Sequence, residues 1–554
     1  MTIHGKSSAM TTGEAVTAAL VAHGIDTVFG VPGIHNDHLL DAFHGARDRL
    51  RFIHTRHEQG AAYMALGAAL AAGKPQAFAV VPGPGLLNAG AALLTAQGMN
   101  APVLGIVGQI PQREIDRGHG YLHEIRDQLG LAGHIAKYTA RIAAPHEAPH
   151  LVAEAIRIAR SGRPGPVILE CAIDVWGRKA PVTLPEMPYA PARPPVDEDA
   201  AERAARILGQ ARRPIMVVGG GAQEASAEVT ALAEMLECPV IAYRRGQGVV
   251  SARHRLAVNL PVGHRLWREA DAVLAIGTRL LIQQMQWGID KDLPVVRVDI
   301  EAQEAERLAP PAAALIGDAV DCCRALLRRI PRHNPVRESR EAELAGHRVW
   351  LAERLARLEP QMGFLRAMRN ALPEHGVFVD EVTQLGFASR LAFPVYRPRS
   401  YFSPGYQDNL GWGIGAALGI KVGLPDAPVL AVTGDGGALY QIGELATAVQ
   451  HAIPIVVVLF DNGSFGNVRL IQKEQYGGRF IADALINPDF VKLAESFGVA
   501  AFRAATPAEL EGAVVDAIAL GRPALIHVPC GEMPSPWDMI LMPRVRPPAS
   551  GIRA

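Results

Sequence analysis

The segment VLAVTGDGGALYQIGELATAVQHAIPIVVVLFDNGSFGN, Val429 to Asn467, decides the fold class of this chain. It predicts an apolar strand, a glycine-rich turn around Asp435, a helix over 438–451, and a second strand, IPIVVVLF, that ends at DNGSFGN. Two strands joined through a helix run parallel, and their carboxyl ends meet at one edge of a sheet. Asp435 and Asn462, which lie 27 positions apart, are therefore expected in one crevice.

The same alternation recurs in the rest of the chain. Short β-branched strands precede alanine-rich helices in FAVV then LLNAGAALLTAQ, and again in IMVVGGG then ASAEVTALAEML. This alternation is typical of parallel α/β sheets. Proline-rich residues 188–199 and charged residues 328–347 separate segments of comparable size. We predict an α/β chain of three doubly wound parallel-sheet domains, over residues 1–182, 195–335 and 355–545.

The composition favours small-molecule chemistry. The 554 residues include 55 basic and 55 acidic side chains, and 49% are hydrophobic, so the sequence has no electrostatic preference for polyanions. The first thirty residues lack a basic segment followed by an apolar run, and no window approaches a membrane span. The five cysteines show no CxxC spacing, which argues against a zinc site or a disulfide framework. We expect a cytoplasmic protein without a nucleic-acid or membrane partner.

The oxygen atoms after the two neighbouring strands suit a hard cation. A carboxylate, an amide oxygen and a turn carbonyl bind Mg²⁺ or Ca²⁺, and Mg²⁺ often shares its coordination sphere with phosphates. Gly434, Gly436 and Gly437 would let backbone N–H groups approach a phosphate where the next helix begins. The alternative is a tight turn in which Asp435 merely caps the helix and Asn462 is an ordinary turn residue.

The spacing GDG, about 27 residues, then N resembles the thiamine-diphosphate-binding motif of one enzyme superfamily. Its members include acetohydroxyacid synthase, benzoylformate decarboxylase and benzaldehyde lyase. The resemblance covers nearly the whole chain, in the order pyrimidine-binding, central and diphosphate-binding domain. It implies that Asp435, Asn462 and the backbone carbonyl of Ser464 hold Mg²⁺ on the diphosphate of the coenzyme, beside Phe465 and Gly466.

A second stretch, RHEQGAAYMALGAALAAG at 56–73, resembles the RHEQGA pattern of the same superfamily and places Glu58 at the head of an apolar helix. In the family this glutamate contacts N1′ of the aminopyrimidine and promotes the imino form that takes the C2 proton. Apolar surroundings raise the pKa of a carboxyl group, which suits such proton sharing. Without the resemblance, Glu58 would be a first-turn glutamate that complements the helix dipole.

Two further stretches complete the expected coenzyme site. NLGWGIGAALG resembles the family segment that bends the coenzyme, and it places Leu410 as the wedge beneath the two rings. The preceding family glycine, whose carbonyl accepts from the 4′-amino group, is Asp408 here. In VDEVTQLG, Thr383 and Gln384 are candidates for contacts to the diphosphate, with an ordinary loop after a strand as the alternative.

Loop residues supply candidates for the acyl chemistry. FGVPGIHNDHLL resembles the family loop over C2, in which benzaldehyde lyase-type enzymes carry a histidine at the position of His35. Imidazole suits proton transfer near neutral pH. Decarboxylases of the benzoylformate type place a serine where this chain has Ile34. Alignment of residues 108–130 puts His123 where relatives often present a glutamine. The alternative is that both histidines are solvated.

Residues after the metal asparagine and near the C-terminus fall where relatives line the substrate pocket or its entrance. These residues are Asn467, Val468, Ile471 and Trp537. Val468 replaces an acid of pyruvate decarboxylases, which argues against simple decarboxylation to a free aldehyde. Trp537 is either a lid residue or part of a packed tail.

The resemblance implies a thiamine-diphosphate- and Mg²⁺-dependent carboligase or lyase, acetolactate synthase-like or benzaldehyde lyase-like, acting next to the carbonyl of a 2-oxo acid or acyloin. The alternatives are a benzoylformate decarboxylase-like 2-oxo acid decarboxylase and a non-catalytic regulatory relative, which Glu58 disfavours. The family completes each site between two subunits, so we expect a homodimer or a homotetramer. Some relatives bind FAD or ADP in the central domain; no motif decides this here, and the GGG at 219–221 favours a structural turn.

Overall fold

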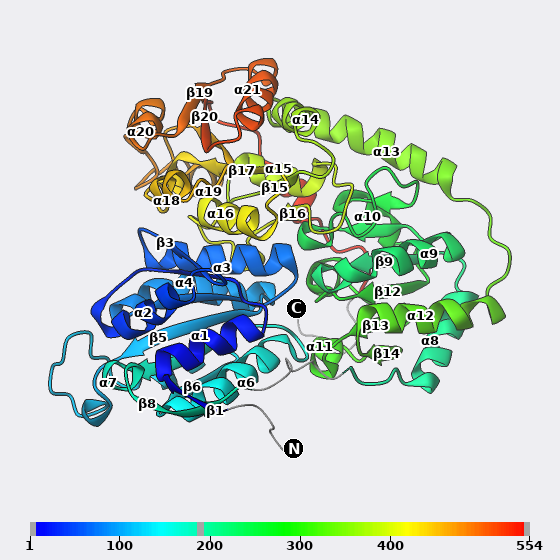
Figure 1. The fold of residues 1–554 in the computed structure, drawn as a ribbon. Coiled ribbons are helices and arrows are strands. Elements are labelled where there is room, and N and C mark those ends of the chain that lie inside the picture. The colour runs from blue at the N-terminus through cyan, green and yellow to red at the C-terminus, as the bar shows by residue number, and fades with distance from the viewer. Residues whose placement is uncertain (1–6, 185–192, 548–554) are drawn as a thin grey trace.

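A computed structural model describes residues 7–184 and 193–547 and contains three parallel sheets of six strands each. In Figure 1 the N-terminal domain (blue and cyan) lies below the C-terminal domain (yellow to red), and the green central domain lies beside both. The predicted fold class is confirmed. Residues 188–192 of the expected linker lie outside the described residues.

The N-terminal sheet has the order β3-β2-β4-β5-β7-β6. Its strands are β2 (Thr27–Gly30), β3 (Arg51–His54), β4 (Gln76–Val80), β5 (Val103–Gln109), β6 (Tyr138–Ile142) and β7 (Val167–Ala172). The helices are α1 (Thr12–Ala22), α2 (Asp37–Gly45), α3 (Glu58–Ala72), α4 (Pro84–Met99), α5 (Gln128–Gly133), α6 (Ala148–Arg160) and α7 (Ile173–Trp176). A separate antiparallel pair joins β1 (Ser7–Thr11) to β8 (Lys179–Thr183).

The central sheet has the order β11-β10-β9-β12-β13-β14. Its strands are β9 (Pro214–Val218), β10 (Val240–Ala242), β11 (Ala257–Val258), β12 (Ala272–Ile276), β13 (Val295–Asp299) and β14 (Ala313–Ile316). The helices are α8 (Glu198–Gln210), α9 (Ser226–Leu236), α10 (Leu260–Trp267), α11 (Ala302–Glu306) and α12 (Ala319–Arg329). The GGG turn after β9 is tied to the turn after β12, because Gly221 N–H donates to the Gly277 carbonyl at 3.0 Å.

The C-terminal sheet has the order β16-β15-β17-β18-β20-β19. Its strands are β15 (Val377–Val379), β16 (Tyr401–Phe402), β17 (Val429–Gly434), β18 (Val456–Asp461), β19 (Ala500–Arg503) and β20 (Ala524–Pro529). The helices, after the connecting α13 (Glu341–Leu355), are α14 (Gln361–Ala371), α15 (Gln384–Ala392), α16 (Gly413–Gly423), α17 (Asp435–Ala438), α18 (Glu444–Gln450), α19 (Gly466–Gln475), α20 (Phe490–Ser496), α21 (Pro507–Ala519) and α22 (Trp537–Ile540).

The helix expected over 438–451 is divided in the structure. α17 is a single turn that begins at Asp435, and α18 begins only at Glu444. The stretch between them includes Ile442 and Gly443, a β-branched residue and a glycine, which are both poor helix formers. The expected βαβ unit still forms, because β17 and β18 pair in parallel.

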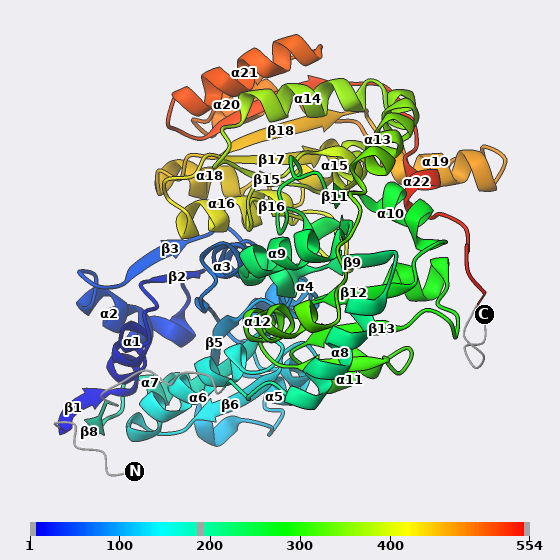
Figure 2. The ribbon, with the colours of Figure 1, turned by 90° about the vertical axis from the view of Figure 1, so that its right-hand side faces the viewer.

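Close contact between α3 and α16 joins the N-terminal and C-terminal domains (Figures 1 and 2). Glycines bring the two backbones together, since a Cβ at Gly67 would collide with the Ala416 carbonyl and one at Gly419 with the Met64 carbonyl. α3 is alanine-rich and almost wholly buried. The head of α3 is thus held against the domain that carries Asp435.

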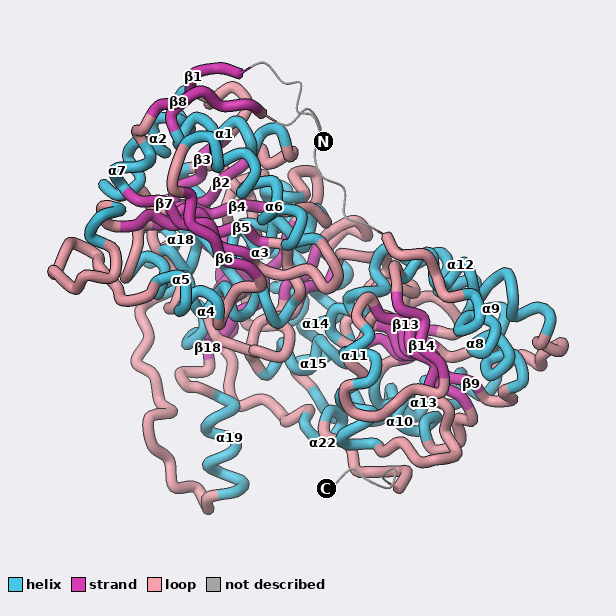
Figure 3. Tube along the Cα trace, turned by 90° about the horizontal axis from the view of Figure 1, so that it is seen from below, coloured by secondary structure: helices cyan, strands magenta, loops and turns pink. Residues whose placement is uncertain are grey.

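α19 and the loop after it extend away from the body of the molecule (Figure 3). Large apolar side chains on this extension are exposed, among them Tyr476, Phe480, Ile481 and Ile486. Within residues 7–184 and 193–547, no helix has the length and apolar character that a membrane crossing needs.

Candidate active site

In the C-terminal sheet the order in which strands are added reverses between β15 and β17. In doubly wound sheets, ligands usually bind in the crevice beyond the carboxyl ends of the strands at such a switch point. A cavity of ≈ 160 Å³ lies there. Among its lining residues are Thr383, Gln384, Leu410, Gly434, Asp435, Gly436, Gly437, Asn462, Ser464, Phe465, Gly466, Asn467 and Val468. The cavity therefore gathers most of the residues that the sequence assigned to coenzyme and substrate.

The three expected metal ligands lie together at the end of this cavity. The backbone N–H of Ser464 donates to Asp435 Oδ2 and to Asn462 Oδ1, at 3.2 Å in each case. Asp435 is only 3% exposed. The described residues contain no group of three or more His, Cys, Asp or Glu side chains that could hold a metal. A cation here would thus bind one carboxylate together with amide, carbonyl and phosphate oxygens, a set that suits Mg²⁺.

An amide, Asn487, holds a second carboxylate, Asp461, near Asp435, and the sequence reasoning missed this arrangement. Asn487 Nδ2 donates to Asp435 Oδ2 and to Asp461 Oδ1, at 2.8 Å each, and His527 Nε2 lies 3.0 Å from Asp461 Oδ2. Burial raises the pKa of Asp435 and the nearby Asp461 raises it further, against the hydrogen bond from Asn487. Burial also acts on Asp461, but its hydrogen bonds, led by that from His527, bring its pKa below the usual value. The adjacent DN at 461–462 was the available signal.

The cavity also fits an anionic group. Gly436 and Gly437 line the cavity, and a Cβ at Gly436 would come within 2.6 Å of the Phe465 ring and one at Gly437 within 2.8 Å of Glu381 Oε1, so neither position has room for a side chain. Gly466 is the first residue of α19, whose free N–H groups favour negative charge. The buried side-chain oxygen of Gln384 has no partner within the described protein, and as an acceptor it suits a cation or a donor group of the coenzyme rather than a phosphate oxygen. These features match a diphosphate with its metal.

Glu381 lies fully buried beneath these glycine turns. Its Oε1 accepts from the backbone N–H of Gly411, next to Leu410, and its Oε2 has no hydrogen-bond partner within the described residues. Burial is the main cause that raises the pKa of Glu381 to about 7. Through its bond to Gly411 N–H, the carboxyl group holds the turn that carries Leu410.

The structure explains Asp408, which stands where the family has glycine. Its φ of 45° is the left-handed conformation that glycine adopts easily. Its carboxylate accepts two hydrogen bonds from Arg390, at 2.8 and 3.0 Å, and one from Arg244 of the central domain at 2.6 Å. Arg390 in turn contacts buried Asp380 at 2.8 Å. Asp408 does not line the cavity, and its side chain anchors the turn through two arginines.

Glu58 is the first residue of α3, as expected, but its carboxylate is half-exposed rather than enclosed by apolar groups. Asn88 Nδ2, on α4, donates to Glu58 Oε2 at 2.9 Å. The carboxylate projects from the end of the helix, where the apolar face no longer covers it. Glu58 does not line the cavity around Asp435 within the same chain.

His35 and His123 meet at the switch point of the N-terminal sheet, between β2 and β4. Their rings stack with centroids 4.9 Å apart. His35 Nε2 lies 3.0 Å from the Leu122 carbonyl, and the buried Nδ1 atoms of both rings have no partner within the described residues. Burial, the largest influence, lowers the pKa of His35, and His123 lowers it further. Ile34 beside them is 56% exposed. Neither histidine lines the cavity around Asp435.

The expected substrate residues of the C-terminal domain also come together. Trp537 Nε1 donates to Asn467 Oδ1 at 2.8 Å, and the Trp537 ring packs on Phe387 with centroids 4.7 Å apart. Val468 and Ile471 lie on α19 and are 46% and 37% exposed. Asn467 and Val468 line the cavity around Asp435, whereas Ile471 and Trp537 are not among its lining residues.

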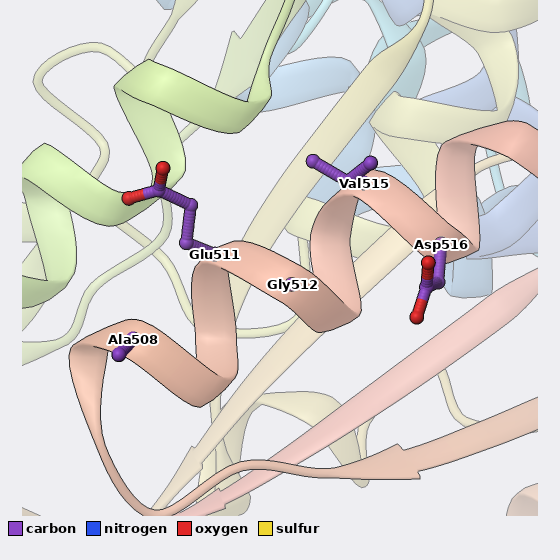
Figure 4. A pocket seen from close by; sticks show the side chains of 5 residues that line it. All are labelled: Ala508, Glu511, Gly512, Val515 and Asp516. Carbon is purple, nitrogen blue, oxygen red and sulfur yellow. The ribbon is translucent and has the colours of Figure 1, made fainter.

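A second hollow lies on α21, and none of its lining residues lines the cavity around Asp435 (Figure 4). Ala508, Gly512 and Val515 line it, and the carboxylates of Glu511 and Asp516 point in different directions. No set of side chains converges there, so the hollow offers no reactive arrangement.

Comparison with known proteins agrees with this geometry. The profile described as "Thiamine pyrophosphate enzyme, N-terminal TPP binding domain" matches residues 10–131, the central domain of the same enzymes matches 201–326, and the C-terminal TPP binding domain matches 381–528. The chain belongs to the thiamine pyrophosphate enzyme family. It is a thiamine-diphosphate-dependent enzyme of transferase or lyase type, and its first and last domains are the coenzyme-binding domains.

Relatives of this thiamine-diphosphate-dependent enzyme include both decarboxylases and synthases. It is 34% identical to the probable 2-ketoarginine decarboxylase of Pseudomonas aeruginosa, over 89% of each chain. It is 31% identical to the probable acetolactate synthase large subunit of Methanocaldococcus jannaschii, over 93% of this chain and 91% of that one. The acetolactate synthase isozyme 3 large subunit of Escherichia coli is 29% identical, over 91% of this chain and 92% of that one.

Proposed function

We propose that the protein is a Mg²⁺-dependent carboligase or lyase that uses thiamine diphosphate to make or break a C–C bond beside the carbonyl of a 2-oxo acid or acyloin. The observation that supports this most directly is the hydrogen bonding of Ser464 N–H to both Asp435 and Asn462 at the switch-point cavity. In this proposal Asp435, Asn462 and the Ser464 carbonyl hold Mg²⁺ on the diphosphate.

The remaining cavity residues orient the coenzyme. The backbone N–H groups of Gly436 and Gly437 and the start of α19 would bind the phosphates, with Thr383 and Gln384 beside them. Leu410 would support the rings of the coenzyme, and the carbonyl of Asp408, which lies outside the cavity lining two positions before Leu410, would accept from the pyrimidine amino group. The bound coenzyme supplies a carbon acid, C2, whose deprotonated form adds to a carbonyl carbon.

The proton chemistry is assigned to residues of the N-terminal domain. Glu58 would contact N1′ of the coenzyme and, by sharing a proton with it, would favour loss of the C2 proton. His35, with one buried and unpartnered nitrogen, moves protons at the reacting oxygen or carbon. His123, stacked on it, helps to place the substrate. Because burial lowers the pKa of His35, the neutral ring that accepts a proton is favoured at neutral pH.

We propose further that each site forms between two chains of a homodimer, or of a homotetramer made of two dimers. The residues that line the cavity around Asp435 all belong to the segment 382–533, and Glu58, His35 and His123 are not among them. Exposed apolar side chains lie near the N-terminal catalytic candidates and also near the cavity around Asp435. They include Ile34, Leu87 and Leu122 near the histidines and Glu58, and Leu439 and Tyr440 after the Asp435 turn. A second copy would cover these surfaces.

Complementation between two inactive variants tests the shared site. Glu58→Gln and Asp435→Ala are each expected to be inactive alone. In a mixed dimer, one site would combine intact Glu58 and intact Asp435, so statistical mixing should restore about one quarter of the wild-type activity. No restoration after dissociation and reassociation of the two variants would refute a site built between chains.

A 2-oxo acid decarboxylase is the second candidate, favoured by the similarity to the probable 2-ketoarginine decarboxylase. The two candidates differ in their products. The purified enzyme, with Mg²⁺ and thiamine diphosphate, should be incubated with pyruvate, benzoylformate and benzoin while CO₂, free aldehyde and C–C-coupled product are measured separately. A carboligase gives a coupled product or splits benzoin. Release of one aldehyde for each CO₂, without coupling, would establish the decarboxylase instead. Absence of turnover of any 2-oxo acid or acyloin in a wider panel would refute both candidates.

A further inference from the structure

Glu444, the first residue of α18, makes a buried contact with the segment that leads into Glu58. Its side chain is only 1% exposed. Oε1 accepts from the backbone N–H groups of Arg56 and His57, at 3.1 and 3.0 Å, and Oε2 accepts from Arg56 N–H at 3.2 Å. The Thr447 hydroxyl donates to Oε2 at 2.6 Å and so fixes the rotamer of the carboxylate.

These bonds lie at the point where the chain leaves β3 and enters α3. Thr55 N–H still bonds to the Gly30 carbonyl of β2, at 2.9 Å, and His57 is already the N-cap of α3. Arg56 and His57 lie between sheet and helix, and their N–H groups turn to Glu444 instead. The packing is tight, since a Cβ at Gly60 would collide with Oε1 of Glu444.

We propose that Glu444 is a positioning residue that fixes the direction in which Glu58 leaves the head of α3. The inference rests on the proposed role of Glu58 at the coenzyme. A charged acceptor holds the two N–H groups more tightly than a neutral one, so residues 56 and 57 keep one conformation. Glu58 follows directly, and its half-exposed carboxylate has Asn88 as a lateral contact. Glu444 itself touches neither coenzyme nor substrate in this proposal.

The predicted consequence is a defect in the C2 proton step. Glu444→Ala leaves the N–H groups of Arg56 and His57 without this acceptor, and a displacement of the catalytic carboxylate by about 1 Å costs on the order of 10²-fold in rate. We expect kcat to fall by that factor while KM for the 2-oxo acid changes little. The exchange of C2–H for deuterium in the bound coenzyme, measured by NMR after a rapid acid quench, should slow in parallel.

Conservative and matched variants separate positioning from mere structural support. In Glu444→Gln the amide oxygen can still accept from both N–H groups, and the Thr447 hydroxyl can rotate to accept from the amide nitrogen, so most of the exchange rate should return. Gln450→Ala is the matched control on the same helix. It removes a 2.6 Å bond to the Arg56 side chain but spares the backbone contacts, and should leave the exchange near wild type.

The same measurement on Glu58→Gln separates the proposed role of Glu58 from the proposed role of Glu444. If Glu58→Gln exchanges C2–H at the wild-type rate, the proposed role of Glu58 fails. Suppose instead that C2–H exchange is slow in Glu58→Gln but occurs at the wild-type rate in Glu444→Ala that is folded and loaded with coenzyme. In that case only the positioning role of Glu444 fails. Should Glu444→Ala aggregate, Glu444→Asp decides, because its carboxylate is one methylene too short to reach both N–H groups. Wild-type exchange in a folded Glu444→Asp would overturn the inference.

Discussion

The carboxyl group of Glu381 should make the stability of the protein depend on pH between about pH 4.5 and 7. Glu381 is fully buried, with one oxygen bonded to the Gly411 N–H and the other without a partner in the described structure. Burial is the largest cause that moves its pKa from the 4.5 of a free glutamate to about 7. Glu381→Gln removes the titration while keeping the size and an acceptor for Gly411.

The sign and size follow from proton linkage. Below pH 4.5 the folded and unfolded chains both carry protonated Glu381, so the folded state has its full stability. As pH rises toward 7, the unfolded chain loses the proton first and the folded state is penalised. At about 1.4 kcal/mol per pH unit, the penalty reaches about 3 kcal/mol once pH exceeds the folded-state value. Glu381→Gln lacks this penalty, so its stability relative to wild type should rise by about 3 kcal/mol over the same window.

Urea denaturation followed by circular dichroism, from pH 4.5 to 8, measures this difference through the transition midpoint. Other groups titrate in both proteins and cancel in the comparison. Glu353→Gln, at an exposed position of α13, is the matched control and should differ from wild type by a constant amount at every pH. A Glu381→Gln difference that stays flat across the range would show that the buried carboxyl group is ionised throughout, and the reasoning from burial would be wrong.

Three further results are expected. His35→Ala should lower kcat on the order of 10²-fold if the ring moves protons, and steady-state kinetics with an unchanged rate would return it to a structural role. Removing Mg²⁺ with a chelator, or making Asp435→Ala, should abolish tight uptake of thiamine diphosphate in calorimetry; undiminished uptake would rule out the proposed metal site. Asp408→Asn should destabilise the enzyme by about 2 kcal/mol, because Arg390 and Arg244 lose a shared charged acceptor. Equal denaturation midpoints for Asp408→Asn and wild type would contradict this.

The sequence was sufficient where local pattern determines three-dimensional position. Two parallel strands joined through a helix must end at one edge of a sheet, so the adjacency of Asp435 and Asn462 followed from the order of elements alone. The structure gives the same adjacency through Ser464 N–H. The head of the helix at Glu58 was equally predictable, because an uninterrupted run of small apolar residues follows it.

Contacts between distant loops could not be read in this way. Asn487 reaches Asp435 from 52 positions away, and Arg244 reaches Asp408 from 164 positions away, and no periodicity links either pair. The division of the expected 438–451 helix depends on how residues 439–443 turn before α18. The half-exposed carboxylate of Glu58 differs from the apolar setting that the helix sequence suggested, because the apolar residues cover the helix and not its end.

The glycines between α3 and α16 limit how the enzyme can move. With backbone pressed on backbone at Gly67 and Gly419, neither helix can slide or roll without breaking this contact. The N-terminal and C-terminal domains of one chain therefore move together as a single rigid body. Opening and closing around a substrate must come from peripheral parts, such as the protruding α19 and the loop that bears His123, so mobility should be concentrated at the rim rather than at the joint.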